Sequence, residues 1–475
     1  MPMSDIRFYT LFIHCLILSL LFGCSQPPPA LQRVLNRGEL IVLTRTDPTT
    51  YSINESGFVS GFEYDLATLF ADKLGVNVRF ELPEQFHDIL QFTSENKADF
   101  AAAGLSVTPE RKQILQFTPP YYEVTQQLVY HYRTRRPKSI KYLADSFFEV
   151  LAGTSHAENL RRLKKNGSDL SWVEAYNTDV LTLVEMVNNG LLDYTITDSN
   201  QFEIFRSRFP ELNVAFSISE PEQIAWAFPK SDDHSLYDEA VKFISDLKQT
   251  GVLKQLQDKH FGYSKHLNYV GICTFRRHFN SRLQALKPFL HQSAEKYGID
   301  RTLLAAVAYQ ESHWNRHAVS PTGVRGIMML TRNTAKQMQI ENRLDPQQSI
   351  DGGAHYLATR LQKIPARIFE PDRTWMALAS YNIGLGHLED ARILTQKQGA
   401  NPDRWVDVKE RLPLLAKKRW YKQTKHGYAR GNEAVTYVTN IRQYIDMLKQ
   451  LELTEAESQN GTETDETFNM QLPAL

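Results

Sequence analysis

The predicted secondary structure of this chain of 475 residues changes once, from alternating strands and helices to helices alone. Residues 39–44, 76–82 and 98–104 are rich in β-branched or small apolar residues and are predicted strands, and residues 63–75 are a predicted helix. Beyond residue 264 no such alternation of strands and helices occurs. The predicted helices of this second half lie at residues 279–297, 331–338, 350–363, 374–381 and 433–453. The length exceeds one ordinary domain, so we expect an α/β half followed by a mainly helical half.

The first residues have the pattern of an export signal. Arg7 precedes an apolar run at residues 11–22, which is short for a membrane-spanning helix. The run ends in Gly23 and Cys24, which resemble the cleavage box of bacterial lipoproteins, where the cysteine becomes the lipidated first residue. We therefore expect a signal peptide at residues 1–23 and a lipid anchor on Cys24. A plain signal peptide or an uncleaved anchor is the alternative, and all three interpretations place the protein outside the cytoplasm.

The composition argues against several other functions. Cys15 and Cys24 lie in or next to the export signal, so only Cys273 remains for the folded part and no intramolecular disulfide is expected. The histidines and cysteines do not cluster with metal-ligand spacing, and we expect no metal and no other cofactor. Residues 264–475 contain 29 Lys and Arg against 21 Asp and Glu, and a basic module attracts anionic polymers. No motif of a nucleic-acid-binding fold accompanies this charge, so we expect no nucleic acid partner.

One acidic residue of the helical half has neighbours that suit a general acid. Leu304, Val307, Ala308 and Glu311 are spaced so that the carboxyl group ends an apolar helical stripe. Trp314 follows shortly after. A carboxyl group among apolar and aromatic groups resists ionisation, so it can act as a general acid near neutral pH. The simpler interpretation is a solvated glutamate on a helix, because most glutamates are exposed.

The residues around Glu311 resemble the motifs of the soluble lytic transglycosylase family, whose members have a lysozyme-like fold. The matching residues are, in chain order, Glu311-Ser312, then Ser320, Gly323, Gly326, Met328 and Leu330, then Ala379-Ser380-Tyr381-Asn382-Ile383-Gly384, and finally Tyr437-Val438. Met329 departs from the pattern, because many members have Gln at that position. Four motifs in this order form a specific signal.

This resemblance implies an enzyme that cuts peptidoglycan between N-acetylmuramic acid and N-acetylglucosamine. Glu311 would protonate the glycosidic oxygen and then accept the proton of the C6 hydroxyl, whose oxygen attacks C1 and leaves a 1,6-anhydro end. Ser312 would orient the carboxylate, and Tyr437 would support it from a neighbouring helix. The other substrate contacts implied are Ser320, Gly326, Met328, Met329, Tyr381 and Asn382. For the last two, a structural pair at a helix end is the alternative. No second carboxylate pairs obviously with Glu311, whereas ordinary glycosidases use two.

The first half resembles the family-3 solute-binding proteins, which are amino-acid receptors of bacterial transport systems. The matching stretches are residues 61–67 (GFEYDLA), 98–106 (ADFAAAGLS), 108–112 (TPERK) and 117–122 (FTPPYY). The resemblance implies two α/β lobes that close on a ligand. It also implies that the chain leaves the first lobe near Tyr130 and re-enters it near Ala225.

The same resemblance implies a set of ligand contacts in the first half. Arg111 would pair with a ligand α-carboxylate, which suits the planar fork of a guanidinium. Ser106 would lie beside the same group, and Thr154 belongs to a turn that offers helix N-terminal amides. Asp198 would face the ligand amine. The alternative is structural, with a helix cap at residues 108–112 and a loop carboxylate at Asp198.

The sequence therefore predicts a multidomain chain. We expect a two-lobed α/β domain resembling periplasmic binding proteins at residues 24–263, a mainly helical lysozyme-like domain at residues 264–453, and a disordered acidic tail at residues 454–475. The expected function is lytic cleavage of peptidoglycan in cell wall turnover, at the periplasmic face of the outer membrane. The first domain would sense an amino acid or a muropeptide. The alternative is an amino-acid or peptide receptor with a non-catalytic helical extension.

Overall fold

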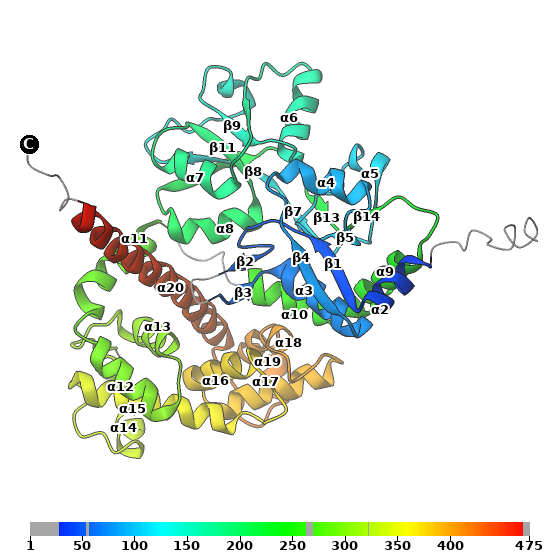
Figure 1. Ribbon diagram of the computed structural model, residues 1–475. Helices are drawn as coiled ribbons and strands as arrows, with labels where there is room; N and C mark the ends of the chain where they lie inside the picture. The colour runs from blue at the N-terminus through cyan, green and yellow to red at the C-terminus, as the bar shows by residue number, and fades with distance from the viewer. Residues whose placement is uncertain (1–27, 54–56, 263–268, 322, 469–475) are drawn as a thin grey trace, which may run out of the picture.

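The computed structural model describes residues 28–53, 57–262, 269–321 and 323–468 (Figure 1). The predicted signal peptide and Cys24 lie outside these residues. An α/β part with two lobes occupies one side of the molecule and a helical part occupies the other. This confirms the predicted fold class. Within the described part of the chain, no helix is both long enough and apolar enough to cross a bilayer.

The first lobe is built on a five-stranded sheet with the order β4-β1-β5-β14-β6. β1 pairs in parallel with β4 and β5, while β14 runs antiparallel to β5 and β6. Its elements are α2 (Ala30–Arg37), β1 (Glu39–Leu43), β2 (Ser52–Ile53), β3 (Val59–Ser60), α3 (Phe62–Leu74), β4 (Asn77–Glu81), α4 (Phe86–Ser94), β5 (Phe100–Ala101), α5 (Arg111–Ile114), β6 (Leu115–Phe117), β7 (Tyr122–Val124), β13 (Glu222–Ile224), β14 (Ala227–Pro229), α9 (Ser235–Thr250) and α10 (Val252–Phe261). Aromatic rings of Phe70, Phe100 and Trp226 fill its core.

The second lobe is inserted between β7 and β13 of the first. Its three-stranded sheet has the order β11-β8-β12, and β9 pairs with β10 beside it. Its elements are β8 (Gln126–His131), η1 (Ile140–Leu143), β9 (Glu149–Leu151), α6 (Ser155–Lys165), β10 (Val173–Ala175), α7 (Val180–Asn188), β11 (Tyr194–Asp198), α8 (Ser199–Arg208) and β12 (Leu212–Ser217). The return near Ala225 is as expected, but the exit lies before Tyr130, because β8 already belongs to the second sheet.

The helical part surrounds one hydrophobic core. Its elements are α11 (Tyr269–His278), the π-helical turn η3 (Phe279–Leu283), α12 (Lys287–Tyr297), α13 (Arg301–Ser312), α14 (Arg332–Gln337), α15 (Pro346–Lys363), α16 (Asp372–Ile383), α17 (Leu385–Lys397), α18 (Trp405–Val408), η4 (Leu412–Ala416), α19 (Lys418–Tyr421) and α20 (Gly431–Phe468). The long helix α20 packs against α13 and α16. It therefore holds together the segments that carry the predicted catalytic motifs.

Helix α20 extends further than expected. It continues to Phe468, so the disordered tail expected from Thr454 is corrected for residues 454–468, and residues 469–475 lie outside the described part. Adding a residue to an existing helix is easier than nucleating a new one. The acidic segment is also rich in Glu, a good helix former. Composition alone therefore underestimated the length of this helix.

Candidate active site

Glu311 lies in the last turn of α13, at the end of a buried apolar stripe. Leu304, Val307 and Ala308 are fully buried, as the spacing predicted. Asp300 caps the start of the helix, and its carboxylate accepts a hydrogen bond from the Leu303 amide at 2.7 Å. A capped start and a buried face fix the register of the helix, and thereby the place of Glu311.

The backbone directly after Glu311 is unusual. His313 and Trp314 have φ angles of 52° and 55°, in the left-handed region that few residues other than glycine adopt. The indole Nε1 of Trp314 donates to the Ala305 carbonyl at 2.9 Å, and its ring is buried against Tyr309. The turn is therefore held by packing and a hydrogen bond. Such strained turns occur at functional sites more often than elsewhere.

The carboxyl group of Glu311 is half-buried and has a tyrosine partner. The hydroxyl of Tyr437, on α20, donates to Glu311 Oε1 at 2.6 Å. Burial raises the pKa of Glu311 to about 7, and the hydrogen bond from Tyr437 opposes that rise. Glu311 therefore keeps its proton at near-neutral pH in a substantial part of the molecules. This is the property expected of a general acid.

Tyrosine rings of α16 and α20 lie at this carboxyl group, and a third ring, from α15, packs against that of α16. The rings of Tyr381 and Tyr437 stack with their centroids 6.3 Å apart, and Tyr356 of α15 meets Tyr381 edge-on at 5.1 Å. Burial and then the charge of Glu311 raise the pKa of both Tyr381 and Tyr437. Both hydroxyls therefore remain donors. Tyr356 was missed by the sequence reasoning, because a lone tyrosine in a helix has no local signal that distinguishes it.

The second motif forms a turn beside the site. Gly326 has a φ of 86°, and a Cβ atom there would lie 1.8 Å from the carbonyl oxygen of Arg343. The close approach of the protein backbone therefore requires glycine at this position. Ser320 also supports the turn, since its hydroxyl accepts from the Val324 amide at 3.2 Å.

The methionines of this motif differ in exposure. Met328 is fully buried, its amide donates to Ser349 Oγ at 3.1 Å, and its side chain packs against Gly353. Met328 thus belongs to the core, although its carbonyl oxygen lies 3.5 Å from the Tyr381 hydroxyl. Met329 is partly exposed and has a φ of 44°. Of the two side chains, only that of Met329 reaches the surface in part.

The structure brings some of the predicted residues to Glu311 and leaves others apart. Tyr437 contacts it directly and Tyr381 lies next to Tyr437. The hydroxyl of Ser312 donates instead to the Ala308 carbonyl at 3.2 Å, one turn back on its own helix. Asn382 is exposed in the last turn of α16. Among the described residues, no group of three His, Cys, Asp or Glu side chains is arranged to hold a metal ion.

In the receptor-like part, Arg111 already has a carboxylate partner. Its buried guanidinium donates from Nε to Glu158 Oε1 at 2.8 Å, from Nη1 to the Ser106 carbonyl at 3.3 Å and from Nη2 to the Gly153 carbonyl at 3.2 Å. Glu158 and Gly153 belong to the second lobe, so Arg111 ties the two lobes together. Glu158 was missed, although it follows Gly153 and Thr154 in the first turn of α6.

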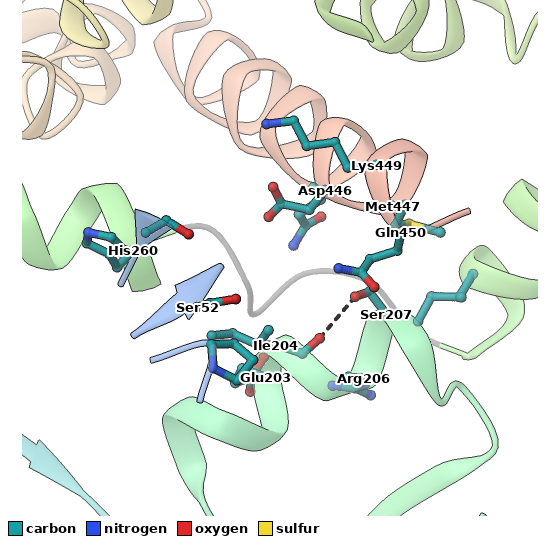
Figure 2. A pocket seen from close by; sticks show the side chains of 14 residues that line it. Ser52, Glu203, Ile204, Arg206, Ser207, His260, Asp446, Met447, Lys449 and Gln450 are labelled. Carbon is teal, nitrogen blue, oxygen red and sulfur yellow. Dashed lines mark hydrogen bonds between the residues drawn. The ribbon is translucent and has the colours of Figure 1, made fainter. Parts of the chain in front are cut away.

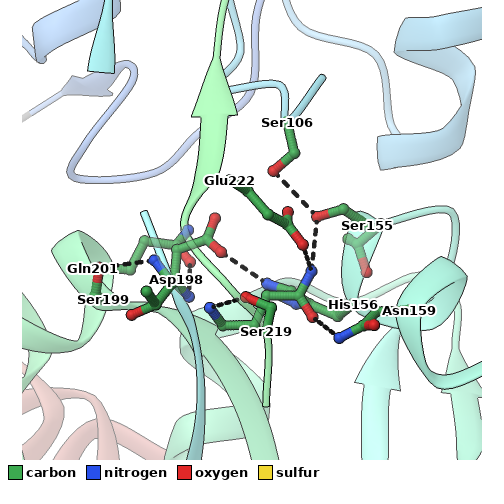
Figure 3. Close-up of polar contacts among 12 residues, drawn as sticks. Ser106, Ser155, His156, Asn159, Asp198, Ser199, Gln201, Ser219 and Glu222 are labelled. Atoms are coloured by element: carbon green, nitrogen blue, oxygen red, sulfur yellow. Dashed lines mark hydrogen bonds and ion pairs between the residues drawn. The ribbon is translucent and has the colours of Figure 1, made fainter. Parts of the chain in front are cut away.

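The other predicted ligand contacts are also engaged within the protein (Figure 3). Asp198 Oδ1 lies 3.0 Å from His156 Nε2, and Ser155 Oγ donates across the lobes to Ser106 Oγ at 3.2 Å. The hydroxyl of Thr154 donates to the Leu151 carbonyl at 2.7 Å. Arg111 and Ser106 thus contact the second lobe directly. Asp198 lines a small cavity together with residues of the first lobe, and Thr154 bonds within the second lobe.

The fold and this site define a class, namely a lytic transglycosylase domain preceded by a solute-binding domain. Residues 289–403 match the family described as "Transglycosylase SLT domain", and residues 40–263 match "Bacterial extracellular solute-binding proteins, family 3". The chain is 49% identical to a membrane-bound lytic murein transglycosylase F of Saccharophagus degradans, over 88% of this chain and 84% of that one. It is 43% identical to one of Idiomarina loihiensis, over 95% of this chain and 99% of that one.

The chain belongs to the membrane-bound lytic murein transglycosylase F family. The transglycosylase match ends at residue 403, so Tyr437 lies beyond it. The position of Tyr437 beside Glu311 therefore comes from the structure, in agreement with the fourth motif in the sequence.

Proposed function

We propose that the chain is a lytic murein transglycosylase in which Glu311 acts first as acid and then as base. The Glu311 proton passes to the glycosidic oxygen as the bond from C1 to that oxygen breaks. The carboxylate then accepts the proton of the C6 hydroxyl as its oxygen bonds to C1. The sugar thus ends as a 1,6-anhydro ring, water is not consumed, and Glu311 regains its proton.

The observation that carries this proposal is a half-buried carboxyl group whose pKa is raised to about 7. Glycosidases that hydrolyse their substrates pair two carboxyl groups roughly 5–9.5 Å apart. The groups that shift the Glu311 pKa are its apolar surroundings and Tyr437, with no second carboxylate of the described residues among them. We therefore propose that one group performs both proton transfers, which an internal hydroxyl suits better than water.

Tyr437 has a defined part in this proposal. Its hydrogen bond to Glu311 stabilises the carboxylate that exists between the two proton transfers. Its own raised pKa keeps the hydroxyl protonated throughout. Tyr437 thus prevents burial from raising the Glu311 pKa so far that proton donation in the first step would lack a driving force.

Glu311→Gln tests the proposal directly. It keeps the size of the side chain and removes the transferable proton, so lytic activity on peptidoglycan should fall by about 10²–10⁴-fold or more. Glu341→Gln is the matched control, because Glu341 is an exposed glutamate of the same part. A folded Glu311→Gln protein with activity equal to this control would refute the assignment.

We further propose that the protein is held at the outer membrane by a lipid on Cys24. The support is the lipoprotein-like sequence before Cys24 and the name "membrane-bound" that the relatives carry. Each buried CH₂ of an acyl chain contributes about 0.8 kcal/mol to membrane binding. An anchored enzyme would reach the glycan strands from the periplasmic face.

We also propose that the receptor-like part binds a small molecule with a carboxylate and an amine, such as an amino acid or a muropeptide stem. The ligand carboxylate would replace Glu158 on Arg111. Glu158 Oε2 is buried and has no hydrogen-bond partner among the described residues. An unpaired buried acceptor costs free energy, which favours displacement of Glu158 from Arg111 by the ligand carboxylate, while Asp198 would face the ligand amine.

The route from this ligand to the catalytic carboxyl group runs through α8 and α20. α8 begins beside Asp198 at the lobe junction, and its residues Glu203, Arg206 and Ser207 face α20 across a cavity (Figure 2). On α20 the cavity is lined by residues that include Asp446, nine positions after Tyr437 and about 13 Å along the helix. Movement of the second lobe would therefore reach the helix that carries Tyr437. A ligand shifts this balance only by binding one arrangement more tightly.

A further inference from the structure

Helix α10 is the last helix of the receptor-like part. Near its C-terminal end, Asp258 forms a buried ion pair with a residue of the catalytic part. Nη1 of Arg442, on α20, lies 2.8 Å from Asp258 Oδ2, and the two side chains are 3% and 8% exposed. Arg442 also donates to the backbone carbonyls of Asp258 and Lys259, and Lys409 pairs with Asp258 Oδ1. Asp258 thus accepts from two cations of the catalytic part.

The same helix holds the start of α16. Gln255, one turn before Asp258, donates to Asp372 Oδ2, and Asp372 Oδ1 accepts from the Trp405 amide at 2.8 Å. Asp372 is the first residue of α16. The guanidinium of Arg442 lies over the ring of Trp375, on the next turn of α16, at 4.9 Å. α10 therefore joins α16 to α20.

These two helices carry the stacked tyrosines of the active site. Tyr381 lies near the far end of α16 and Tyr437 on α20, where it precedes Arg442 by five positions, about 7.5 Å along the helix. A displacement at Arg442 is transmitted along a rigid helix to Tyr437. Buried ion pairs contribute little net stability, but they can fix one specific packing arrangement.

We propose that Asp258 is a positioning residue for the lytic reaction, which acts through Arg442 to hold α16 and α20 so that Tyr381 and Tyr437 enclose Glu311. The receptor-like part thereby contributes to the geometry of the catalytic site. This inference rests on the proposed role of Glu311 as the acid and base.

The inference predicts a direction for the pH dependence. Tyr381 and Tyr437 face Glu311 from α16 and α20, and burial raises the Glu311 pKa more than the Tyr437 hydrogen bond lowers it. If α16 and α20 move apart, water reaches the carboxyl group and its pKa falls. The rate, which needs protonated Glu311, then declines at a lower pH than in the wild type. Loss of the Tyr437 hydroxyl alone has the opposite effect.

The first test is Asp258→Asn in the full chain, with kcat, KM and the pH profile measured on peptidoglycan fragments. We expect kcat to fall about tenfold or more, since a misplacement of about 1 Å can reduce rates about 100-fold. We also expect the alkaline side of the profile to move to lower pH. Lys254→Ala is the matched control on α10, because Lys254 makes only exposed pairs with Asp407 and Glu410 at 3.4 and 2.7 Å. This control should retain the wild-type rate and profile.

A second variant separates positioning from folding. Asp258→Leu with Arg442→Met replaces the pair by apolar groups, a change that often preserves or increases stability. We expect this folded double variant to show the same loss of kcat and the same pH shift. A wild-type rate and profile in either folded variant would overturn the inference. If Glu311→Gln is inactive in that case, the proposed function stands and only the role of Asp258 fails.

Discussion

Replacing Tyr437 by phenylalanine removes the hydrogen bond to Glu311 and keeps the ring that stacks on Tyr381. A hydrogen bond to a charged group contributes about 1.5–3 kcal/mol and one to a neutral group about 0.5–1.5 kcal/mol. The difference of about 1–1.5 kcal/mol is the preference of the bond for the ionised carboxylate. Since one pKa unit corresponds to about 1.4 kcal/mol, the pKa of Glu311 should rise by about one unit above its value near 7.

This shift has two consequences for the rate of Tyr437→Phe. The alkaline side of the pH profile moves up by about one unit, because Glu311 stays protonated to higher pH. The maximal rate falls by about five- to tenfold, because the carboxylate formed in the first step loses about 1 kcal/mol of stabilisation. The assay is release of 1,6-anhydro fragments from peptidoglycan across a pH series, with unfolding followed on the same samples.

Tyr444→Phe is the control for this prediction. Tyr444 lies two turns further along α20, where its ring stacks on Phe275, and it has no part in the proposed reaction. Its variant should keep the wild-type profile. An alkaline side that stays in place, or moves to lower pH, in a folded Tyr437→Phe protein would contradict the proposed balance between burial and the hydrogen bond.

Three further predictions concern stability, the receptor-like part and the membrane. The pKa of Glu311 is raised from 4.5 to about 7 in the folded state, so the wild type loses up to about 3 kcal/mol of folding free energy as the pH rises through that window. Urea titrations at the lower and upper ends of this pH window should show no such loss in Glu311→Gln. An equal decline in the stability of this variant would count against a raised pKa at Glu311. In calorimetry, Glu158→Gln should bind amino acids or stem peptides about 10- to 100-fold more tightly than the wild type, because it removes the carboxylate that competes for Arg111. Arg111→Ala should weaken this binding by about 1.5–3 kcal/mol. Equal affinities for the wild type and both variants would refute displacement of Glu158. Cys24→Ala should move the protein from the membrane to the soluble fraction or stall its processing, and unchanged fractionation would argue against a lipid anchor.

Local sequence patterns predicted the elements that depend on neighbouring residues. The strand at residues 39–44 appears as β1 and the helix at residues 63–75 as α3. Asp300, a residue type that favours helix starts, caps α13. Pro288 stands in the first turn of α12, where the longer predicted helix divides. In each case a β-branched run, a capping carboxylate or a proline acts on the chain within a few residues.

Other features could not be predicted because they depend on distant or buried polar groups. α17 was missed because Asp390 and Arg392 occupy buried positions on it, which conceals the apolar period. The partner of Arg111 lies 47 positions away, and the resemblance to receptors suggested a ligand in its place. Asp258 and Arg442 are 184 positions apart, in different parts of the chain, and no local pattern links them.

The contact between Tyr437 and Glu311 joins distant residues, but it could be predicted in part from the sequence. The residues are 126 positions apart, so spacing and periodicity alone could not bring them together. The resemblance to lytic transglycosylases implied that Tyr437 supports the carboxylate, and in the structure the Tyr437 hydroxyl contacts it. The raised pKa followed from elementary reasoning about a carboxyl group at the end of an apolar stripe.

The most direct test of the account is the mass of the fragments that the purified full chain releases from peptidoglycan. Internal attack by the C6 hydroxyl gives muramic acid ends that are lighter by one water than hydrolysed ends. We predict that every new end formed by the wild type carries this anhydro mass and that Glu311→Gln forms none. Release of hydrolysed reducing ends by the wild type, or of anhydro ends by Glu311→Gln, would contradict a mechanism in which one carboxyl group performs both proton transfers.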